Sequence, residues 1–217
     1  MNWEKTKKRI IRDLTEPIKS ADKFPYKIDL SDCLDYLKVV LEYEIDDNKI
    51  SGLADSVFNS INEYFSGSHE HSDRLNILRI LVTNYESFLK KIIYIIDKEY
   101  YWKISDSKQT GLIPLIKKLN LNRENIFFSE EKISELIGKP YFIEHICRTY
   151  ILRNEFSHHS PELSTQQIAE SINSILIAYL VAIFESDEQL LNSLPSINKF
   201  VNEKKQIFQN RIFPDWE

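Results

Sequence analysis

The longest helical pattern in the chain lies at residues 72–103, which read SDRLNILRILVTNYESFLKKIIYIIDKEYYWK. Its apolar residues recur at spacings of three and four, which places them on one face of an α-helix. We expect a single long helix here, with Ser72 or Asp73 as its N-terminal cap and an apolar face wide enough for the centre of a fold. This face consists of Leu75, Leu78, Leu81, Val82, Tyr85, Phe88, Leu89, Ile92 and Ile96.

The same spacing continues on both sides of this stretch, and no segment alternates apolar and polar residues for long enough to predict a strand. The 217 residues include only four glycines, whereas strands joined by tight turns need this residue often. We therefore expect an all-α fold, an antiparallel bundle of helices. The other helices are expected at residues 3–14 (ending before Pro17), 30–45, 50–65, 110–120, 129–138, 140–157, 165–186 (capped by Ser164 or Thr165), 187–193 and 196–211.

A polar break, SGSHEHS at residues 66–72, interrupts the helical pattern. We interpret it as the boundary between an N-terminal helical appendage, residues 1–68, and a main helical bundle, residues 69–217. The sequence does not indicate what the appendage does.

Two histidines in this break, His69 and His71, are close enough in the sequence to be considered as metal ligands. A metal site needs further ligands nearby, and the neighbouring candidates are only Glu70 and Asp73. We therefore interpret the break as a solvated loop, and we expect neither a metal nor a cofactor.

The charge balance and the cysteine count restrict the class of protein. The 28 basic and 33 acidic residues give a net charge of -5, which excludes a protein that is basic throughout but allows a local basic patch. Two distant cysteines, Cys33 and Cys147, are too few for a disulfide framework. The N-terminal residues lack the apolar core of a signal peptide, and the longest near-apolar run, residues 172–184, is too short to cross a bilayer. We expect a cytoplasmic protein that does not enter membranes.

The helix expected at residues 140–157 departs from the ordinary amphipathic pattern. At about 100° per residue, Arg153, Asn154 and Ser157 fall within its apolar face, and His158 lies near the edge of that face. Buried polar groups destabilise a fold unless they find partners. Two interpretations are open: Arg153 forms a buried bridge to a carboxylate, or it faces an anionic ligand that its planar guanidinium binds with two hydrogen bonds.

His158 adds a group that can transfer protons near neutral pH. On an ideal helix, Arg153 and His158 point about 140° apart. They converge only if the helix ends or distorts near Ser157, or if a second subunit contributes. We expect such an ending, because the polar residues 157–160 and Pro161 follow one another here.

The stretch RNEFSH at residues 153–158 fits the pattern R-x4-H, with an asparagine after the arginine, between two expected helices. Over residues 72–190, the chain resembles the HEPN superfamily, helical-bundle proteins whose R-x(4–6)-H motif marks metal-independent ribonucleases. A second match is VTNYESFL at residues 82–89. It is similar to the early HEPN helix that carries a polar residue facing the motif, and in this chain that residue is Glu86.

The resemblance implies an endoribonuclease in which both motifs of a homodimer line one cleft. In this chemistry the ribose 2′-hydroxyl of the RNA attacks the adjacent phosphate, and the products carry a 2′,3′-cyclic phosphate and a 5′-hydroxyl. By motif position, Arg153 would stabilise the transition-state charge and His158 would assist proton transfer or hold the leaving oxygen. Asn154 would orient the phosphate or His158, and Glu86 would position Arg153.

The resemblance also implies a biological setting. Family members serve as toxins or antiviral-defence effectors, controlled by an antitoxin or a sensor protein. Others have lost activity and act as modules for dimerisation or partner binding, which is the alternative function for this chain.

Three further groups of residues fit RNA binding. The alternative for the basic cluster is a solvated helix face, and the alternative for the aromatic residues is packing against a dimer partner. The lysines could line the rim of a cleft, but the sequence assigns them no position in space. The three groups are the basic cluster Lys5, Lys7, Lys8, Arg9 and Arg12, the aromatic residues Tyr100, Tyr101 and Trp102, and the lysines Lys90, Lys91, Lys117 and Lys118.

Overall fold

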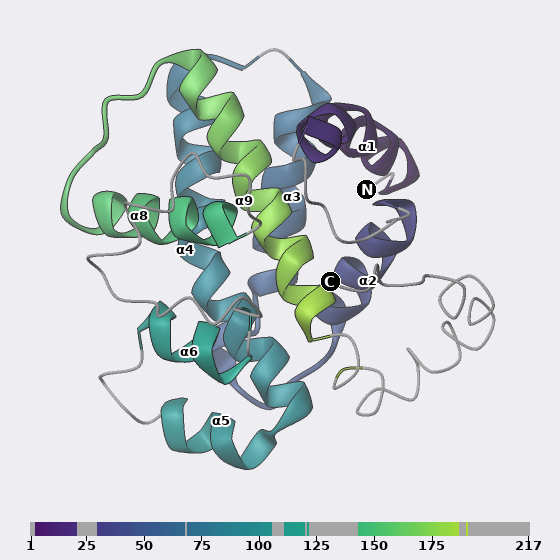
Figure 1. Cartoon of the computed structure of the whole chain (residues 1–217), viewed down its shortest axis with the longest axis vertical. Helices are drawn as coiled ribbons and strands as arrows, with labels where there is room; N and C mark the ends of the chain where they lie inside the picture. Colours follow the sequence, from purple (N-terminus) through teal and green to yellow (C-terminus); the bar gives the residue numbers. More distant parts are fainter. Residues whose placement is uncertain are drawn as a thin grey trace, which may run out of the picture.

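A computed structural model describes residues 3–20, 30–67, 69–105, 111–119, 121, 143–186 and 190 of the chain (Figure 1). All regular elements within these residues are helical, which confirms the all-α fold. The helices expected at 129–138 and 196–211 lie outside the described residues, as does 187–193 apart from residue 190. The described helices are α1 (Trp3–Ser20), α2 (Leu30–Glu42), the short 3-10 helix η1 (Asn48–Ile50), α3 (Leu53–Ser66), α4 (His71–Ile96), α5 (Lys98–Ser105), α6 (Leu112–Lys118), α8 (Ile143–His158) and α9 (Thr165–Glu185).

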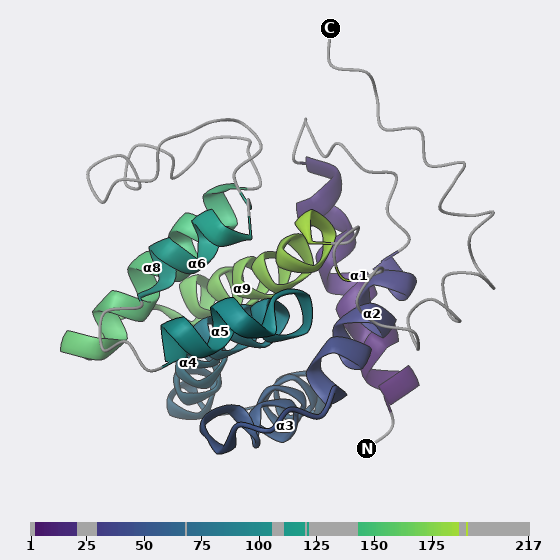
Figure 2. The same ribbon diagram turned by 90° about the horizontal axis from the view of Figure 1, so that it is seen from below.

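Helix α9 is the central element of the fold. It packs against α4, α8, α2 and α1, and in Figure 2 α1 and α2 lie on one side of it while α6 and α8 lie on the other. Every residue from Ile175 to Ile183 is buried, so this part of the helix has no polar face.

The length of α9 corrects one expectation. Because the helix begins at Thr165, the segment 165–183 is long enough and apolar enough to cross a membrane. The near-apolar run 172–184, on which the expectation of no membrane span was based, is only part of this helix. However, 67% of the stretch is buried inside the protein, as in the core helix of a globular domain.

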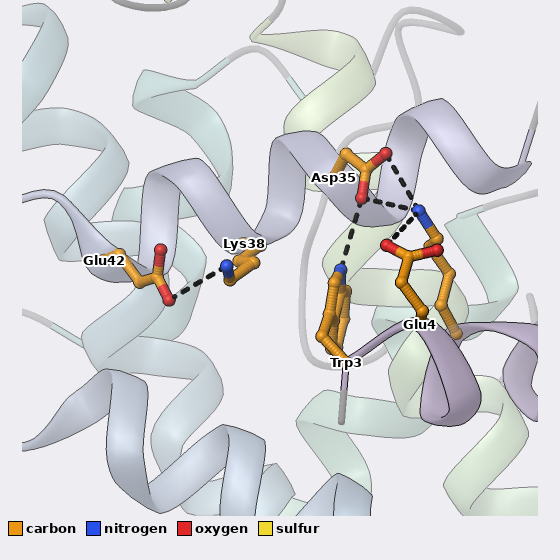
Figure 3. A network of polar contacts seen from close by, with 6 residues as sticks. Trp3, Glu4, Asp35, Lys38 and Glu42 are labelled. Atoms are coloured by element: carbon orange, nitrogen blue, oxygen red, sulfur yellow. Dashed lines mark hydrogen bonds and ion pairs between the residues drawn. The ribbon is translucent and has the colours of Figure 1, made fainter. Parts of the chain in front are cut away.

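The N-terminal helices contribute to the same core. Apolar side chains of α1, α2 and α3 join those of α4 and α9 in one continuous cluster. A polar network also links α1 to α2, as Figure 3 shows: Asp35 accepts hydrogen bonds from the Trp3 indole at 3.2 Å and from the Lys7 ammonium at 2.9 Å. The same ammonium pairs with Glu4 at 3.1 Å. The division of the chain into appendage and bundle at the polar break stays a prediction, because a shared core does not show whether either part folds alone.

Helix α1 is longer than expected. It continues through Pro17 to Ser20, although proline removes one backbone hydrogen bond from a helix interior. The preceding turns are anchored by Ile10 and Leu14, which are both fully buried. Their packing offsets the lost hydrogen bond.

The long helix expected at residues 72–103 is divided at Asp97 into α4 and α5. The Asp97 carboxylate accepts a hydrogen bond from the backbone N–H of Tyr100 at 2.9 Å, so it caps the N-terminus of α5. Lys118 donates to the same carboxylate at 2.8 Å, and these two hydrogen bonds hold the pKa of Asp97 below its usual value. An internal aspartate therefore ends the helix that apolar spacing alone predicted to continue.

The start of α4 also differs from expectation. The helix begins at His71, and Glu70 occupies the cap position without a side-chain hydrogen bond, so neither Ser72 nor Asp73 is the cap.

Lys91 of α4 is buried at the C-terminal end of α2. Its ammonium donates a hydrogen bond to the carbonyl oxygen of Leu41, in the last turn of α2, where backbone carbonyls have no partner within their own helix. Burial lowers the pKa of Lys91 to about 8, and the negative charge of Glu42 offsets this only in part.

We expect Lys91→Met to remove a pH dependence of the unfolding free energy. The unfolded chain keeps the ordinary lysine pKa of 10.5, so between about pH 8 and this value it binds more protons than the folded chain. In the wild type the unfolding free energy therefore rises with pH across this window, by up to about 3 kcal/mol. Urea unfolding at about pH 7.5 and about pH 9.5 measures the rise, and an equal rise in the variant would contradict the prediction.

Candidate functional site

Helix α8 carries the R-x4-H motif in its last two turns. The helix stays regular through His158, and the Ser157 hydroxyl donates to the carbonyl of Arg153 at 2.8 Å. Residues 159–164 are not helical. The next helix then begins with a capping box, in which Ser164 N–H donates to the Gln167 side chain at 2.8 Å and Gln167 N–H donates to the Ser164 hydroxyl at 3.2 Å. Ser164 is therefore the N-terminal cap of α9, which confirms one of the two residues expected at this position.

Three of the four predicted site residues lie together where α8 meets α4. The guanidinium of Arg153 donates from Nη2 to Oε2 of Glu86 at 2.9 Å and from Nη1 to the side-chain oxygen of Asn154 at 3.3 Å. The pairing of Arg153 with Glu86 joins residues 67 positions apart in the sequence. It shows that the polar residue of the long helix faces the motif.

Lys90 is the residue of this cluster to which the sequence assigned no position. Its ammonium pairs with Oε1 of Glu86 at 2.7 Å, so one carboxylate holds two cations. The side chains of Arg153, Lys90 and Glu86 are 34%, 24% and 15% exposed. The cluster therefore carries a net positive charge at a surface that solvent reaches. The Glu86–Lys90 spacing of four is the sequence signal for their contact.

His158 lies apart from this cluster. It is exposed in the last turn of α8, with its ring 6.4 Å from the ring of His159. Within the described residues, no hydrogen bond joins His158 to Arg153. Because α8 does not distort before His158, the separation of about 140° between the two side chains persists.

Arg153 is suited to bind an anion without losing its present partners. Glu86 and Asn154 each engage one of its terminal nitrogens and hold the guanidinium plane in place. The exposed third of the side chain can still meet a phosphate, for which a planar guanidinium provides matching donors.

Two residues of the basic cluster on α1, Lys7 and Arg9, contact other helices of the fold. Lys7 pairs with Asp35 and Glu4, and Arg12 pairs with the neighbouring Asp13 at 2.7 Å. Arg9 donates to the carbonyl oxygen of Phe65 at the end of α3. Lys7 and Arg9 therefore serve the fold, whereas Lys5, Lys8 and Arg12 lie exposed on α1.

The aromatic residues divide between core and surface. Tyr101 is 1% exposed and donates its hydroxyl to Asp47 at 2.5 Å, whereas Trp102 is 37% exposed. The structure therefore uses Tyr101 as a core residue and leaves Trp102 at the surface.

The two histidines of the polar break are engaged in separate contacts. His69 donates to the carbonyl of Glu63 at 2.5 Å, and Nδ1 of His71 lies 3.3 Å from the Thr165 hydroxyl. Among the residues that the structure describes, no group of three or more His, Cys, Asp or Glu side chains could hold a metal ion.

The fold and the cluster define an all-helical protein with a partly exposed, cationic polar site between two helices. Comparisons with protein-family models, with curated proteins and with solved structures find no match for the chain.

Proposed function

We propose that the chain is a metal-independent endoribonuclease of the HEPN type. The observation that carries the proposal is the pairing of Arg153 with Glu86, which orients the arginine of an R-x4-H motif while leaving a third of its side chain exposed.

The proposed reaction is a transesterification within the RNA. The ribose 2′-oxygen loses its proton and forms a bond to the adjacent phosphorus, while the bond from phosphorus to the 5′-oxygen breaks and that oxygen takes up a proton. Arg153 stabilises the negative charge that develops on the phosphate oxygens, an electrostatic contribution in the transition state. His158 assists the proton transfers, and Asn154 and Glu86 position Arg153.

In this proposal, a homodimer brings an arginine and a histidine of the motif together in one site. Arg153 and His158 diverge on one copy of α8, so His158 of one subunit would complete the site around Arg153 of the other. Such an enzyme would serve as a toxin or antiviral-defence effector, held in check by an antitoxin or a sensor protein.

The second candidate function is a HEPN-like module without catalytic activity, used for dimerisation or partner binding. The closed set of contacts around Glu86 favours it, because both carboxylate oxygens are occupied by Lys90 and Arg153. In that case the cluster would fasten α8 to α4 and nothing more.

The two candidates separate in an RNA cleavage assay with a chelator present. We expect the wild type to cut RNA and to leave 2′,3′-cyclic phosphate ends, and we expect His158→Ala to lose this activity. His159→Ala is the matched control, because His159 is an exposed neighbour of the same type and its substitution should leave cleavage unchanged. A stable wild-type dimer that leaves diverse RNAs intact would favour the module.

A further inference from the structure

Arg79 is a cation that neither the fold nor the proposed reaction uses. It lies exposed on α4, and its guanidinium forms no hydrogen bond or ion pair with another described residue. Residues 79, 83, 86 and 90 follow one another at helical spacing, so Arg79 shares a face of α4 with Glu86 and Lys90. Seven residues separate Arg79 from Glu86, which corresponds to about 10 Å along the helix axis.

The surface between Arg79 and Glu86 is open. Thr83 lies between them and is exposed, and its hydroxyl donates back to the carbonyl of Arg79 at 2.9 Å instead of reaching outward. An extended ligand held by Arg153 therefore meets Arg79 next if it follows this face toward the start of α4.

A shallow hollow of about 540 Å³ continues the same face beyond Arg79. Leu75, one turn before Arg79, lines it together with His71 and residues 160–164. Residues 160–164 belong to the connection between α8 and α9, which in Figure 1 leaves the end of α8 and rises to the start of α9. The hydrogen bond between the His71 ring and Thr165 at 3.3 Å holds the imidazole in place.

The lining of this hollow suits a nucleobase better than a phosphate. His71 and Pro161 offer ring surfaces, and histidine rings stack on unpaired bases in RNA complexes. The Ser160 hydroxyl and the Glu162 carboxylate offer hydrogen-bond partners for a base edge. The charge of Glu162 would repel a phosphate at the same place.

We propose that this face of α4 is a binding track for single-stranded RNA, in which Arg79 contacts a backbone phosphate and the hollow at His71 takes the base of a flanking nucleotide. The hollow, Arg79 and the Arg153 cluster follow in this order over about 16 Å of one helix. The proposal rests on the proposed function for the position of the cleaved phosphate. A single strand is required because the bases of a duplex are paired and cannot enter the hollow.

Binding of a short single-stranded 2′-O-methyl oligoribonucleotide tests the phosphate contact, because this probe lacks the hydroxyl that would attack. We expect Arg79→Glu to weaken binding about tenfold at low salt. The slope of log Kd against log salt concentration should also decrease by about 1, which corresponds to the loss of one phosphate contact. Lys8→Glu is the charge-matched control: Lys8 is exposed on α1, and it forms no ion pair with another described residue. No binding by the wild type, equal losses in the two variants, or equal binding of a duplex would overturn the proposal.

The base contact is tested with variants at His71. We expect His71→Ala to weaken binding about fivefold or more, with the salt dependence unchanged, because one stack of a base on an aromatic ring is lost. His71→Phe keeps a stacking ring and Thr165→Val removes only the hydrogen bond, so both should lose less. An equal loss in His71→Ala and His71→Phe would refute the base contact.

The binding track and the proposed nuclease activity can be refuted separately. RNA binding that depends on Arg79 without any cleavage would uphold the track and refute the nuclease. Cleavage that depends on Arg153 but is indifferent to Arg79→Glu would do the reverse.

Discussion

Replacing Arg153 by alanine is expected to lower RNA cleavage about a thousandfold. Removing one preorganised donor from a site that stabilises negative charge costs a factor of this order in other enzymes. The loss should appear in kcat, because the arginine acts most strongly on the charge that develops in the transition state. Single-turnover cleavage of a labelled RNA in the presence of a chelator measures it.

Two further variants show whether the geometry of Arg153 or only its charge matters. Arg153→Lys keeps the charge but lacks the planar arrangement of donors, so most of the activity should still be lost. Glu86→Gln keeps an oxygen acceptor near Arg153 but removes its charge, so we expect a smaller loss, about tenfold.

Thermal unfolding of the same variants controls for the fold. The ion pair between Arg153 and Glu86 is partly exposed, with side chains 34% and 15% exposed. Its loss should therefore change stability only modestly. A variant Arg153→Ala that cleaves RNA as well as the wild type would contradict the proposed role, and one that only unfolds or loses its dimer would favour the binding module.

Replacing Tyr179 by alanine is expected to lower the unfolding free energy by about 3–5 kcal/mol. Tyr179 is fully buried in α9, with its ring 5.2 Å from that of Tyr85 and 4.7 Å from that of Phe88. Its hydroxyl donates to the carbonyl of Leu81 at 2.9 Å, and the Tyr85 hydroxyl donates in return to Ala178 at 3.1 Å. Truncation would open a cavity where α4 and α9 cross, and urea unfolding measures the cost.

Tyr179→Phe is the control for this substitution. It keeps the ring and removes one hydrogen bond, so the expected loss is only about 1 kcal/mol. Equal losses in the alanine and phenylalanine variants would show that ring packing is not what stabilises this contact.

We expect the same two tyrosines to lower the unfolding free energy at alkaline pH. Burial raises the pKa of Tyr85 and of Tyr179 above the ordinary value of 10.0. The ionisation of these tyrosines therefore leaves the unfolding free energy unchanged below this value. The unfolding free energy falls as the pH rises above it, because the tyrosines of the unfolded chain ionise first.

Several features of the fold and the candidate site were predictable from the sequence because they depend on local spacing. Apolar residues at intervals of three and four predicted the helices that became α2, α4 and α9. The helical wheel gave the separation of Arg153 from His158, but the expected end of the helix near Ser157 was wrong, since α8 stays regular through His158. The choice of Glu86 came instead from the resemblance of residues 82–89 to a helix of the HEPN superfamily.

Other features were not predictable because they depend on contacts between distant segments. The break between α4 and α5 depends on Asp97 capping the new helix and on Lys118 from α6. The engagement of Lys7 by Asp35 of α2 likewise decided that this lysine serves the fold.

The sequence by itself determined that the chain is helical, where most of its helices run and which polar residues interrupt an apolar face, because helical periodicity is written in the spacing of side chains. Only the tertiary structure decided which partners those polar residues meet. It brought Arg153 of α8 to Glu86 of α4 and formed the hollow at His71. Such pairings depend on how α8 crosses α4, and that crossing is set by the packing of both helices on α9, which no local spacing encodes.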